Sequence, residues 1–311
     1  MFATQAFDKF TTDVSVMNAD GTGRKLLTED PAQDVNPAWS PDGTRIAFAS
    51  GRDDGNFEIY VMDADGGNQT RLTTTPEDDY GPQWSPDGSR IAYTAYQDDS
   101  ITSGIVVMNA DGTAPYKLTT DPDSASDQPA WSPDGSEIVY TSERDGDREI
   151  YVVMADGSGQ VRLTTNPGDD SDPAWSPDGT KIAYTSDRNL LSEVYVMNAD
   201  GSGQTRLTTS SDNAREPVWS PDGTRIAYTA YPASTLTIFV MNADGSGQTR
   251  LTAPSDTASE PQWSPDGTRI AFKSASGDNA EIFVINADGS GATNVTNTPA
   301  SEHDPHWRPS K

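Results

Sequence analysis

One phrase returns along the whole chain and limits the possible folds more than any other feature. The motif "WSPDG" begins six times, at residues 39, 84, 131, 175, 219 and 263, and a seventh Trp at 307 precedes the last residues, "RPSK". The spacings between these tryptophans are 45, 47, 44, 44, 44 and 44 residues. Repeats of about 40–50 residues that contain several short strands are typical of propeller blades.

Each repeat contains four segments that favour β-strands. The segment "PAW" is short and extended, and "SPDG" places Pro and Gly where a type I hairpin turn needs them. The segments "RIAFAS" and "EIYVMD" are apolar on both faces, which is expected of strands that lie between two sheets. A turn "ADGG" or "ADGSG" then leads to an outer strand, "TRLT". No helical periodicity is present, so each repeat predicts one four-stranded antiparallel sheet.

The two ends of the chain complement each other. Residues 1–38 match a repeat that lacks its first strand, and residues 303–311 supply that strand. Stacking blades in a closed ring covers both apolar faces of every sheet. We therefore predict an all-β fold, a seven-bladed β-propeller that forms a single domain over 1–311. In its closing blade, built from 1–38 and 303–311, the C-terminal strand pairs with the N-terminal strands.

These residues resemble a known family. The pattern "PxWSPDGxxIAYxS…IYVMNADGxxxxxLT" is similar to the WD40-like PD40 repeat of TolB-type β-propellers, and the similarity covers nearly the whole chain. The resemblance implies a propeller that interacts with proteins in the periplasm. TolB proteins of this family have six blades and an additional α/β domain, and this chain departs from them on both points. Similar propellers also cap peptidases of the prolyl-oligopeptidase type.

Composition narrows the choice of partners. The chain of 311 residues has 48 acidic and 21 basic side chains, a net charge of −27, and no Cys. Such a polyanion repels phosphate backbones and anionic lipids, so nucleic acid and membrane insertion are not expected. It attracts cations and basic surfaces, although a plain solubilising surface is the alternative. No apolar run could span a membrane, and residues 1–10 do not resemble a signal peptide. We expect a monomer, either a mature periplasmic or secreted form or a cytoplasmic protein.

Acidic residues precede every Trp and suggest a cation site. Stacking the blades would gather them at one mouth of the central channel, where unpaired carboxylates repel each other unless a cation lies among them. Oxygen ligands in a flexible ring suit Ca²⁺. The alternative is that these carboxylates are solvated or accept hydrogen bonds from nearby backbone N–H groups. The candidate metal ligands are Asp172, Glu216, Glu260 and Asp304, three residues before a Trp, and Asp34, Asp79, Asp127 and Asp170, four or five residues before one.

Other acidic residues are better explained by turns or ion pairs. The aspartates of the "ADG" turns lack the loop length and the bidentate Glu of a calcium-binding loop, so we interpret them as turn residues. In three blades an Arg follows the second strand and a Glu begins the third. We predict ion pairs across these hairpins, namely Arg52 with Glu58, Arg144 with Glu149, and Arg188 with Glu193.

The sequence offers little that could perform catalysis. The G-x-S-x-G motif of hydrolases is absent, and the only histidines are His303 and His306, which lie on the C-terminal strand. We expect His306 to fill the position that Ala38, Gln83 or Val218 holds in other blades. The sequence therefore predicts a protein that is not an enzyme, without catalytic residues or organic cofactors.

Variable loops on a rigid scaffold usually carry binding. We therefore predict that the acidic loop face binds a protein partner, with calcium as a possible cofactor. One alternative is a metal-dependent lyase or hydrolase that acts in the channel mouth. Another is a carbohydrate-binding adhesin that uses the loop residues Tyr80, Tyr96 and Tyr231.

Overall fold

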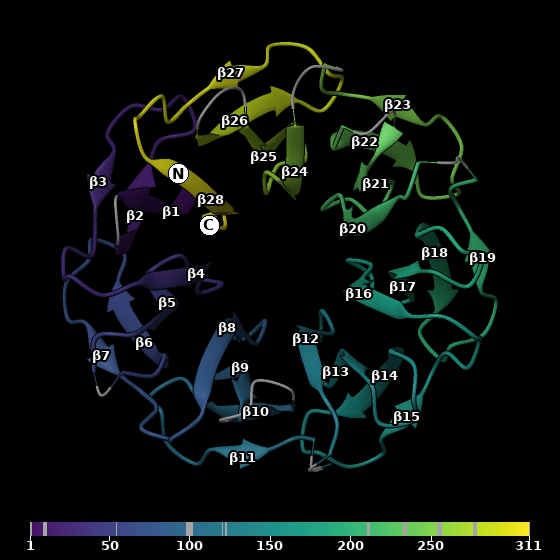
Figure 1. Ribbon diagram of the computed structural model, residues 1–311, viewed down its shortest axis with the longest axis horizontal. Coiled ribbons are helices and arrows are strands. Elements are labelled where there is room, and N and C mark those ends of the chain that lie inside the picture. Colours follow the sequence, from purple (N-terminus) through teal and green to yellow (C-terminus); the bar gives the residue numbers. More distant parts are fainter. Residues whose placement is uncertain are drawn as a thin grey trace.

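The strands surround a central axis as seven four-stranded antiparallel sheets (Figure 1). This arrangement confirms the predicted all-β propeller with four-stranded antiparallel blades. The computed structural model describes residues 2–8, 11–53, 55–97, 102–119, 121, 123–209, 212–232, 235–253, 257–275 and 279–310. Within these ranges no helix is long and apolar enough to cross a membrane.

Each blade presents its strands in the same order from the axis outward. The innermost strands end in the repeated tryptophans; they are β4 (Asp34–Trp39), β8 (Asp78–Trp84), β12 (Ser126–Trp131), β16 (Asp170–Trp175), β20 (Arg215–Trp219), β24 (Thr257–Trp263) and β28 (Ser301–Trp307). The second strands are β1 (Phe2–Asp8), β5 (Arg45–Ser50), β9 (Arg90–Tyr96), β13 (Glu137–Ser142), β17 (Lys181–Ser186), β21 (Arg225–Ala230) and β25 (Arg269–Ala275).

The third and outer strands complete the blades. The third strands are β2 (Thr11–Met17), β6 (Glu58–Asp63), β10 (Ser103–Asn109), β14 (Glu149–Met154), β18 (Glu193–Asn198), β22 (Thr237–Asn242) and β26 (Ala280–Asn286). The outer strands have two residues each: β3 (Lys25–Leu26), β7 (Thr70–Arg71), β11 (Tyr116–Lys117), β15 (Val161–Arg162), β19 (Thr205–Arg206), β23 (Thr249–Arg250) and β27 (Thr293–Asn294).

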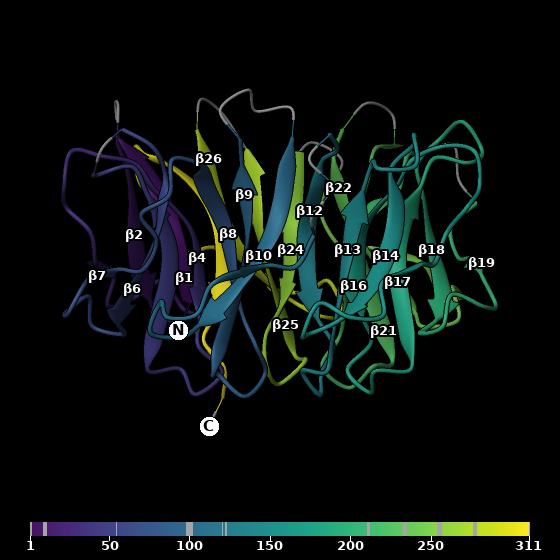
Figure 2. The ribbon, with the colours of Figure 1, turned by 90° about the horizontal axis from the view of Figure 1, so that it is seen from below.

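The propeller has two different ends, which edge-on views separate (Figure 2). The "SPDG" and "ADG" turns lie at the end where the inner strands reach their Trp, and we name it the turn face. We name the other end the loop face, because the longer connections lie there, from second to third strands and from outer strands to the next inner strand. Every inner strand therefore begins at the loop face, and the candidate acids lie within these strands, before the Trp.

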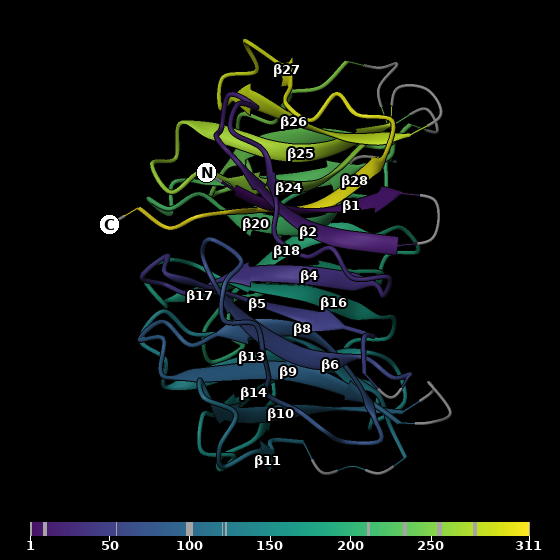
Figure 3. The same cartoon turned by 90° about the vertical axis from the view of Figure 1, so that its left-hand side faces the viewer.

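The two termini of the chain meet in one blade. Strand β28 pairs with β1, from Phe2 opposite Trp307 to Phe7 opposite Ser301, and the sheet has the order β28-β1-β2-β3. The side view shows β28 and β1 next to each other, with the C-terminus leaving at the turn face (Figure 3). The last strand of the chain is therefore the innermost strand of the blade that the first residues begin.

Neighbouring blades are joined through the tryptophans. Six indole N–H groups donate a hydrogen bond to the inner strand of the preceding blade; Trp263, for example, bonds the Val218 carbonyl at 3.1 Å. An Arg side chain also covers several of these rings, as Arg225 covers Trp263 at 4.7 Å. At the ring closure, the Trp39 backbone N–H instead donates to His306 Nδ1 at 3.3 Å.

The other repeated residues serve the blade itself. In all seven blades a backbone N–H of the third strand donates to a Thr hydroxyl of the "LT" segment; the Ile150 N–H, for example, donates to Thr164 Oγ1 at 2.9 Å. The "ADG" aspartates close their turns, as Asp200 does by accepting the Ser202 backbone N–H at 2.9 Å. This contact confirms that they are turn residues.

Candidate functional site

A bulge in every inner strand determines where the residue three places before the Trp lies. Pairing between the first and second strands shifts register there, between Ser171 and Ala174 in β16, for example. The residue in the bulge has a positive φ although a Pro follows it, a position where left-handed backbone is disfavoured. These residues are Asn36 (φ 52°), Gly81 (60°), Gln128 (54°), Asp172 (53°), Glu216 (56°), Glu260 (58°) and Asp304 (49°). A bulge redirects a side chain, and here it does so at one level of the channel in all seven blades.

The bulge residues contact one another around the channel mouth. The Glu260 carboxylate accepts the Asp304 backbone N–H at 3.0 Å and pairs with the Lys273 ammonium group on β25. Asn36 Nδ2 donates to Asp304 Oδ2 at 3.3 Å. The Asp172 backbone N–H likewise donates to Gln128 Oε1 at 3.0 Å. The predicted alternative, carboxylates that accept hydrogen bonds from backbone N–H groups, is therefore present at Glu260.

Threonines extend this ring of contacts between Asp172 and Glu216. The Thr185 hydroxyl donates to Asp172 Oδ2 at 2.9 Å, and its oxygen accepts the Glu216 backbone N–H at 3.1 Å. Glu216 Oε2 accepts the Thr229 hydroxyl at 3.0 Å. The structure therefore places Asp172, Glu216, Glu260 and Asp304 on four successive inner strands, as their spacing predicts.

A cavity of about 300 Å³ opens at this mouth. Five inner strands line it, β4, β8, β20, β24 and β28, and its acidic residues are Glu216, Glu260 and Asp304. Gly81 leaves room because it brings no side chain to the ring. His306 lines the cavity beside Ala38, Gln83 and Val218, the position that the repeat predicts for it. Burial lowers the pKa of His306 to about 4, so the imidazole is neutral at pH 7.

The cavity is acidic, and burial together with neighbouring charges raises the pKa values of two of its carboxyl groups. Burial, and then the neighbouring Glu260 charge, raise the pKa of Asp304 to about 6. Burial also raises the pKa of Glu216, opposed by the Thr229 hydrogen bond, while the Asp172 and Glu260 charges raise it further. A bound cation would relieve this repulsion. Among the residues that the structure describes, however, no three His, Asp or Glu side chains are close enough together to hold a metal ion.

The other candidate ligands are internal to the blades. Asp34 is fully buried and bonded by Arg52 Nη2 at 2.9 and 3.0 Å, and Arg148 Nη2 holds both oxygens of Asp127 at 2.6 and 2.7 Å. Asp170 is equally buried and pairs with Arg188 at 3.3 Å. These arginines supply the positive charge beside the carboxylates that a metal ion was predicted to supply.

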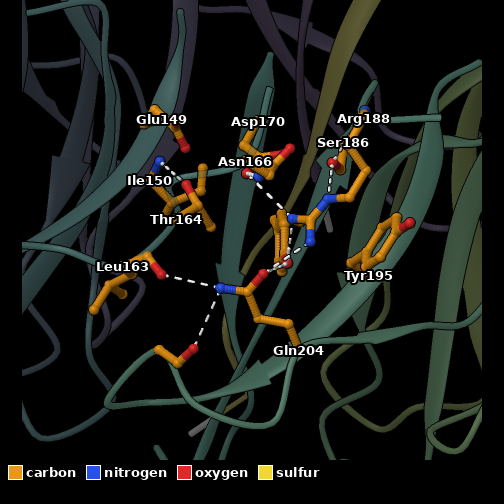
Figure 4. A network of polar contacts seen from close by, with 12 residues as sticks. Glu149, Ile150, Leu163, Thr164, Asn166, Asp170, Ser186, Arg188, Tyr195 and Gln204 are labelled. Atoms are coloured by element: carbon orange, nitrogen blue, oxygen red, sulfur yellow. Dashed lines mark hydrogen bonds and ion pairs between the residues drawn. The ribbon is translucent and has the colours of Figure 1, made fainter. Parts of the chain in front are cut away.

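Figure 4 shows the Asp170 network in detail. The Arg188 side chain donates to Ser186 Oγ at 2.7 Å and to Gln204 Oε1 at 2.8 Å, and its guanidinium lies 4.3 Å from the Tyr195 ring centroid. Gln204 in turn donates to the Leu163 carbonyl of the preceding blade at 3.1 Å. Hydrogen bonds and a ring contact of Arg188 therefore fix the first residues of the loop that follows β17.

Among the described residues, no arginine forms a salt bridge with Asp79. It is fully buried, its Oδ1 has no hydrogen-bond partner in the described part of the chain, and the Thr75 hydroxyl reaches its Oδ2 at only 3.3 Å. Desolvation raises the pKa of Asp79 to about 7. The blade of β8–β11 has Gln97 at the position where the blade of β4–β7 has Arg52. This difference is visible in the sequence and could have identified the carboxylate that has no arginine beside it.

The predicted ion pairs across the hairpins are wrong. Glu58 pairs with Arg71 at 2.6 Å, and Glu149 and Glu193 pair with Arg162 and Arg206. The outer strand runs beside the third strand, so its Arg reaches the Glu. The arginines of the loops turn inward instead, Arg52 and Arg188 to buried aspartates and Arg144 onto the Tyr151 ring at 3.9 Å.

The loop tyrosines do not form a common platform. Tyr80 packs between Phe57 and Tyr96, with ring centroids 4.6 and 5.9 Å away. Tyr231 is 42% exposed and lies in the loop after β21, three blades further along the chain.

The fold defines a class, the β-propellers built from four-stranded antiparallel blades. Within that class, the chain belongs to the PD40 family, described as the TolB beta propeller domain, whose profile matches residues 2–126, 56–252 and 214–311. Dipeptidyl-peptidase 5 of Porphyromonas gingivalis is 44% identical over 43 residues, which is 14% of this chain and 6% of that protein.

Solved structures share the fold at low identity. TolB from Acinetobacter baumannii matches with a TM-score of 0.68 at 22% identity, over 87% of this chain and 68% of that one. Oligogalacturonate lyase from Vibrio parahaemolyticus matches with a TM-score of 0.70 at 14% identity, over 94% and 84% of the two chains. A puromycin hydrolase also matches, and this chain spans about half its length (52%).

These similarities correct the prediction that the chain is not an enzyme. Proteins with this propeller include a lyase, puromycin hydrolases and prolyl endopeptidases. The prediction was based on missing sequence motifs, and a propeller can contribute to an enzyme without them. The fold gives no ground for excluding catalysis.

Proposed function

We propose that this propeller is a binding protein whose loop face receives a basic protein partner at the channel mouth. The observation that carries the proposal is the acidic cavity of about 300 Å³, to which Glu216, Glu260 and Asp304 contribute from successive inner strands. A concave site with converging polar groups is where propellers and other folds usually bind ligands. The net charge of −27 adds long-range attraction for a basic partner.

Family membership supports a protein partner. The resemblance to TolB-type propellers implies protein interaction, and the loop face carries the connections that vary most between the blades. A periplasmic or secreted location fits such a role and stays a prediction. A divalent cation that joins the acidic mouth to the partner is part of the proposal. Such a cation would have to gather carboxylates that the described conformation keeps apart.

The similarity to oligogalacturonate lyase raises the question of whether this cavity suits the substrate of that enzyme. Oligogalacturonate is a polyanion, and an anionic chain would be repelled by Glu216, Glu260 and Asp304 at this mouth. The substrate of that relative therefore does not suit this cavity, whereas lysine and arginine side chains do.

A matched pair of substitutions tests the proposal. A fluorescent twelve-residue lysine-rich peptide is titrated into the wild-type protein, Glu216→Gln and Glu137→Gln. Glu137 begins β13 at the turn face, so its change removes the same charge from the opposite end. We expect Glu216→Gln to raise the Kd at least threefold and Glu137→Gln to leave it nearly unchanged. Equal effects of the two substitutions would show that only the overall charge attracts the peptide.

A photoreactive version of the peptide locates the contact. Cross-links near residues 212–216 and 257–262 are expected because these segments enter the inner strands at the loop face. Cross-links confined to the "ADG" turns would place binding on the turn face and contradict the proposal.

A further inference from the structure

Three of the exposed large apolar side chains come from two loops of the loop face that one short segment joins. Among the described residues, six such side chains are exposed; Leu26, Met154 and Val161 belong to third or outer strands. The remaining three are Leu190 (97% exposed), Leu191 (36%) and Tyr231 (42%), from the loops after β17 and β21 in neighbouring blades. We name these three the loop-face anchor.

The two loops of the anchor are joined by one short segment. The Ala214 backbone N–H donates to the Ser192 carbonyl at 2.7 Å, and the Ser192 N–H donates to Asn213 Oδ1 at 3.1 Å. The Tyr231 N–H donates to the carbonyl of Asp212, at the start of the same segment. The anchor residues therefore come from two neighbouring blades whose loops are tied to one segment, 212–214, just before the strand that carries Glu216.

The equivalent turn in the preceding blade shows that Leu190 is not needed by the fold. There, Gly146 occupies the same place, with φ 112° and its N–H bonded to the Glu143 carbonyl at 3.0 Å. Leu190 makes the matching bond to the Asp187 carbonyl at 2.9 Å and has φ 74°. A bulky residue in this region of backbone conformation is strained. The Leu side chain is almost fully exposed, so its own packing does not offset this cost.

The anchor stands on a rigid support. Arg188, two residues before Leu190, bonds Ser186, Asp170, Gln204 and the Tyr184 hydroxyl and lies against the Tyr195 ring (Figure 4). Asn189 Nδ2 also donates to the Tyr195 hydroxyl at 2.6 Å. A loop that is held in place before binding loses less conformational entropy when a partner covers it.

The surroundings indicate which partner fits. Asp169 and Asp187 are exposed beside the anchor, and the Asp187 N–H bonds the Asp169 carbonyl. Asp212 flanks it on the Tyr231 side, and Arg215 is an exposed base nearby. Acidic groups around an apolar centre complement a segment with the opposite arrangement, apolar side chains flanked by lysine or arginine. A second copy of this chain would bring another net charge of −27, so it is a less favourable partner than a basic segment.

We propose that the loop-face anchor, Leu190, Leu191 and Tyr231, is the apolar contact that binds a basic, apolar segment of the partner protein. The inference rests on the proposed function and names the residues that would supply contact area beyond the charge of the channel mouth. Large exposed apolar groups that gather in one place mark interaction surfaces, and tyrosine is enriched in protein interfaces.

Three labelled twelve-residue peptides and four proteins test this. The first peptide has a Leu-Phe pair flanked by lysines, the second has serines in place of Leu-Phe, and the third has glutamates in place of the lysines. The proteins are the wild type, Leu190→Gly, Tyr231→Ser and, as a control for loss of an exposed apolar side chain, Val161→Thr. Binding is measured by fluorescence anisotropy and folding by thermal melting.

We expect the first peptide to bind the wild type more tightly than the other two. Leu190→Gly should weaken its binding at least fivefold and leave the Tm equal or higher, because Gly relieves the positive φ. Tyr231→Ser should also weaken binding, whereas Val161→Thr should not. Binding of the serine peptide should be the same in all four proteins.

Several outcomes would overturn the inference. If Leu190→Gly binds the first peptide as the wild type does, while Glu216→Gln weakens it, the anchor fails and the proposed function stands. If no lysine-rich peptide binds the wild type, both fail. Equal binding of the glutamate peptide would contradict the basic partner. A dimer in sedimentation that Leu190→Gly abolishes would assign the surface to self-association.

Discussion

Asp34 and Asp79 occupy the same position in successive blades, five residues before the Trp, yet their environments differ. Asp34 has Arg52 beside it, whereas Asp79 has Gln97 in the corresponding loop and an unpartnered Oδ1 among the described residues. Burial without a cation favours the neutral form of a carboxyl group. Burial raises the pKa of both carboxyl groups, but at Asp34 the hydrogen bonds from Ser50 and Arg52 and the Arg52 charge oppose the rise. Ionised Asp34 should therefore cost less stability at neutral pH than ionised Asp79.

Asp79→Asn should stabilise the protein at pH 8 by roughly 2–4 kcal/mol, since each pKa unit corresponds to about 1.4 kcal/mol. The pKa of about 7 in the folded state lies above the ordinary value of 3.8. The native form therefore binds its proton more tightly than the unfolded chain, and stability falls as pH rises from about 4 to 7. The gain from Asn should vanish at pH 4, which urea unfolding at both values of pH measures.

Asp34→Asn serves as the matched control. It removes a hydrogen-bonded charge partner of Arg52 and should destabilise the protein at pH 8 by about 1–3 kcal/mol. If Asp79→Asn also destabilised at pH 8, or had the same effect at both values of pH, Asp79 would be ionised and paired in the folded protein.

Among the elements, β28 has the largest role for its length. It is the inner strand of its blade and pairs with β1 from the other end of the chain. Its Trp307 donates to the Gln262 carbonyl at 2.9 Å, and Arg308 covers Trp39 at 5.1 Å. The strand therefore contacts both neighbouring blades as well as β1.

Deletion of residues 303–311 should lower the Tm clearly and produce oligomers. Without most of β28, strand β1 presents unpaired N–H and C=O groups, which can pair with another chain. Differential scanning calorimetry and size-exclusion chromatography measure the two effects. Deletion of 309–311 alone is the control, since it leaves β28 and Arg308 intact. A monomer with unchanged Tm after the longer deletion would show that β28 is dispensable for the ring.

At the scale of the whole molecule, the charge of −27 opposes folding through mutual repulsion. Part of that repulsion is concentrated at the channel mouth, where burial and neighbouring charges raise the pKa values of Glu216 and Asp304. Screening by any salt relieves the general repulsion, whereas only a bound ion acts at the mouth in particular.

Millimolar CaCl₂ should therefore raise the Tm more than NaCl of equal ionic strength. A ligand of the folded state stabilises it by about 2.7 kcal/mol at a hundredfold excess over Kd. The double change Glu216→Gln and Glu260→Gln should remove the calcium-specific part and keep the NaCl effect, and EDTA should reverse the calcium shift. Equal shifts with both salts would contradict a cation site.

The repeat pattern alone was sufficient to predict the blades. Segments that are apolar on both faces and the "SPDG" and "ADG" turns are local signals, each contained in a few residues, and the Trp spacing repeats them at a regular interval. The position of His306 beside Ala38 and Val218 follows from alignment of the repeats alone. The level of Asp172, Glu216, Glu260 and Asp304 was predictable for the same reason, because equivalent positions in stacked repeats lie at equivalent heights.

The contacts of these residues, in contrast, depend on the assembled ring. The bulge before each Pro turns Glu260 toward the Asp304 N–H, although sequence preference disfavours that backbone conformation. Arg71 rather than Arg52 reaches Glu58, because the outer strand runs beside the third strand. Nothing in the sequence distinguishes Leu190 from other loop residues, whereas its positive φ and high exposure distinguish it in the structure. Partners of this kind depend on distances between strands and loops that no local pattern specifies, so they appear only when the ring is assembled.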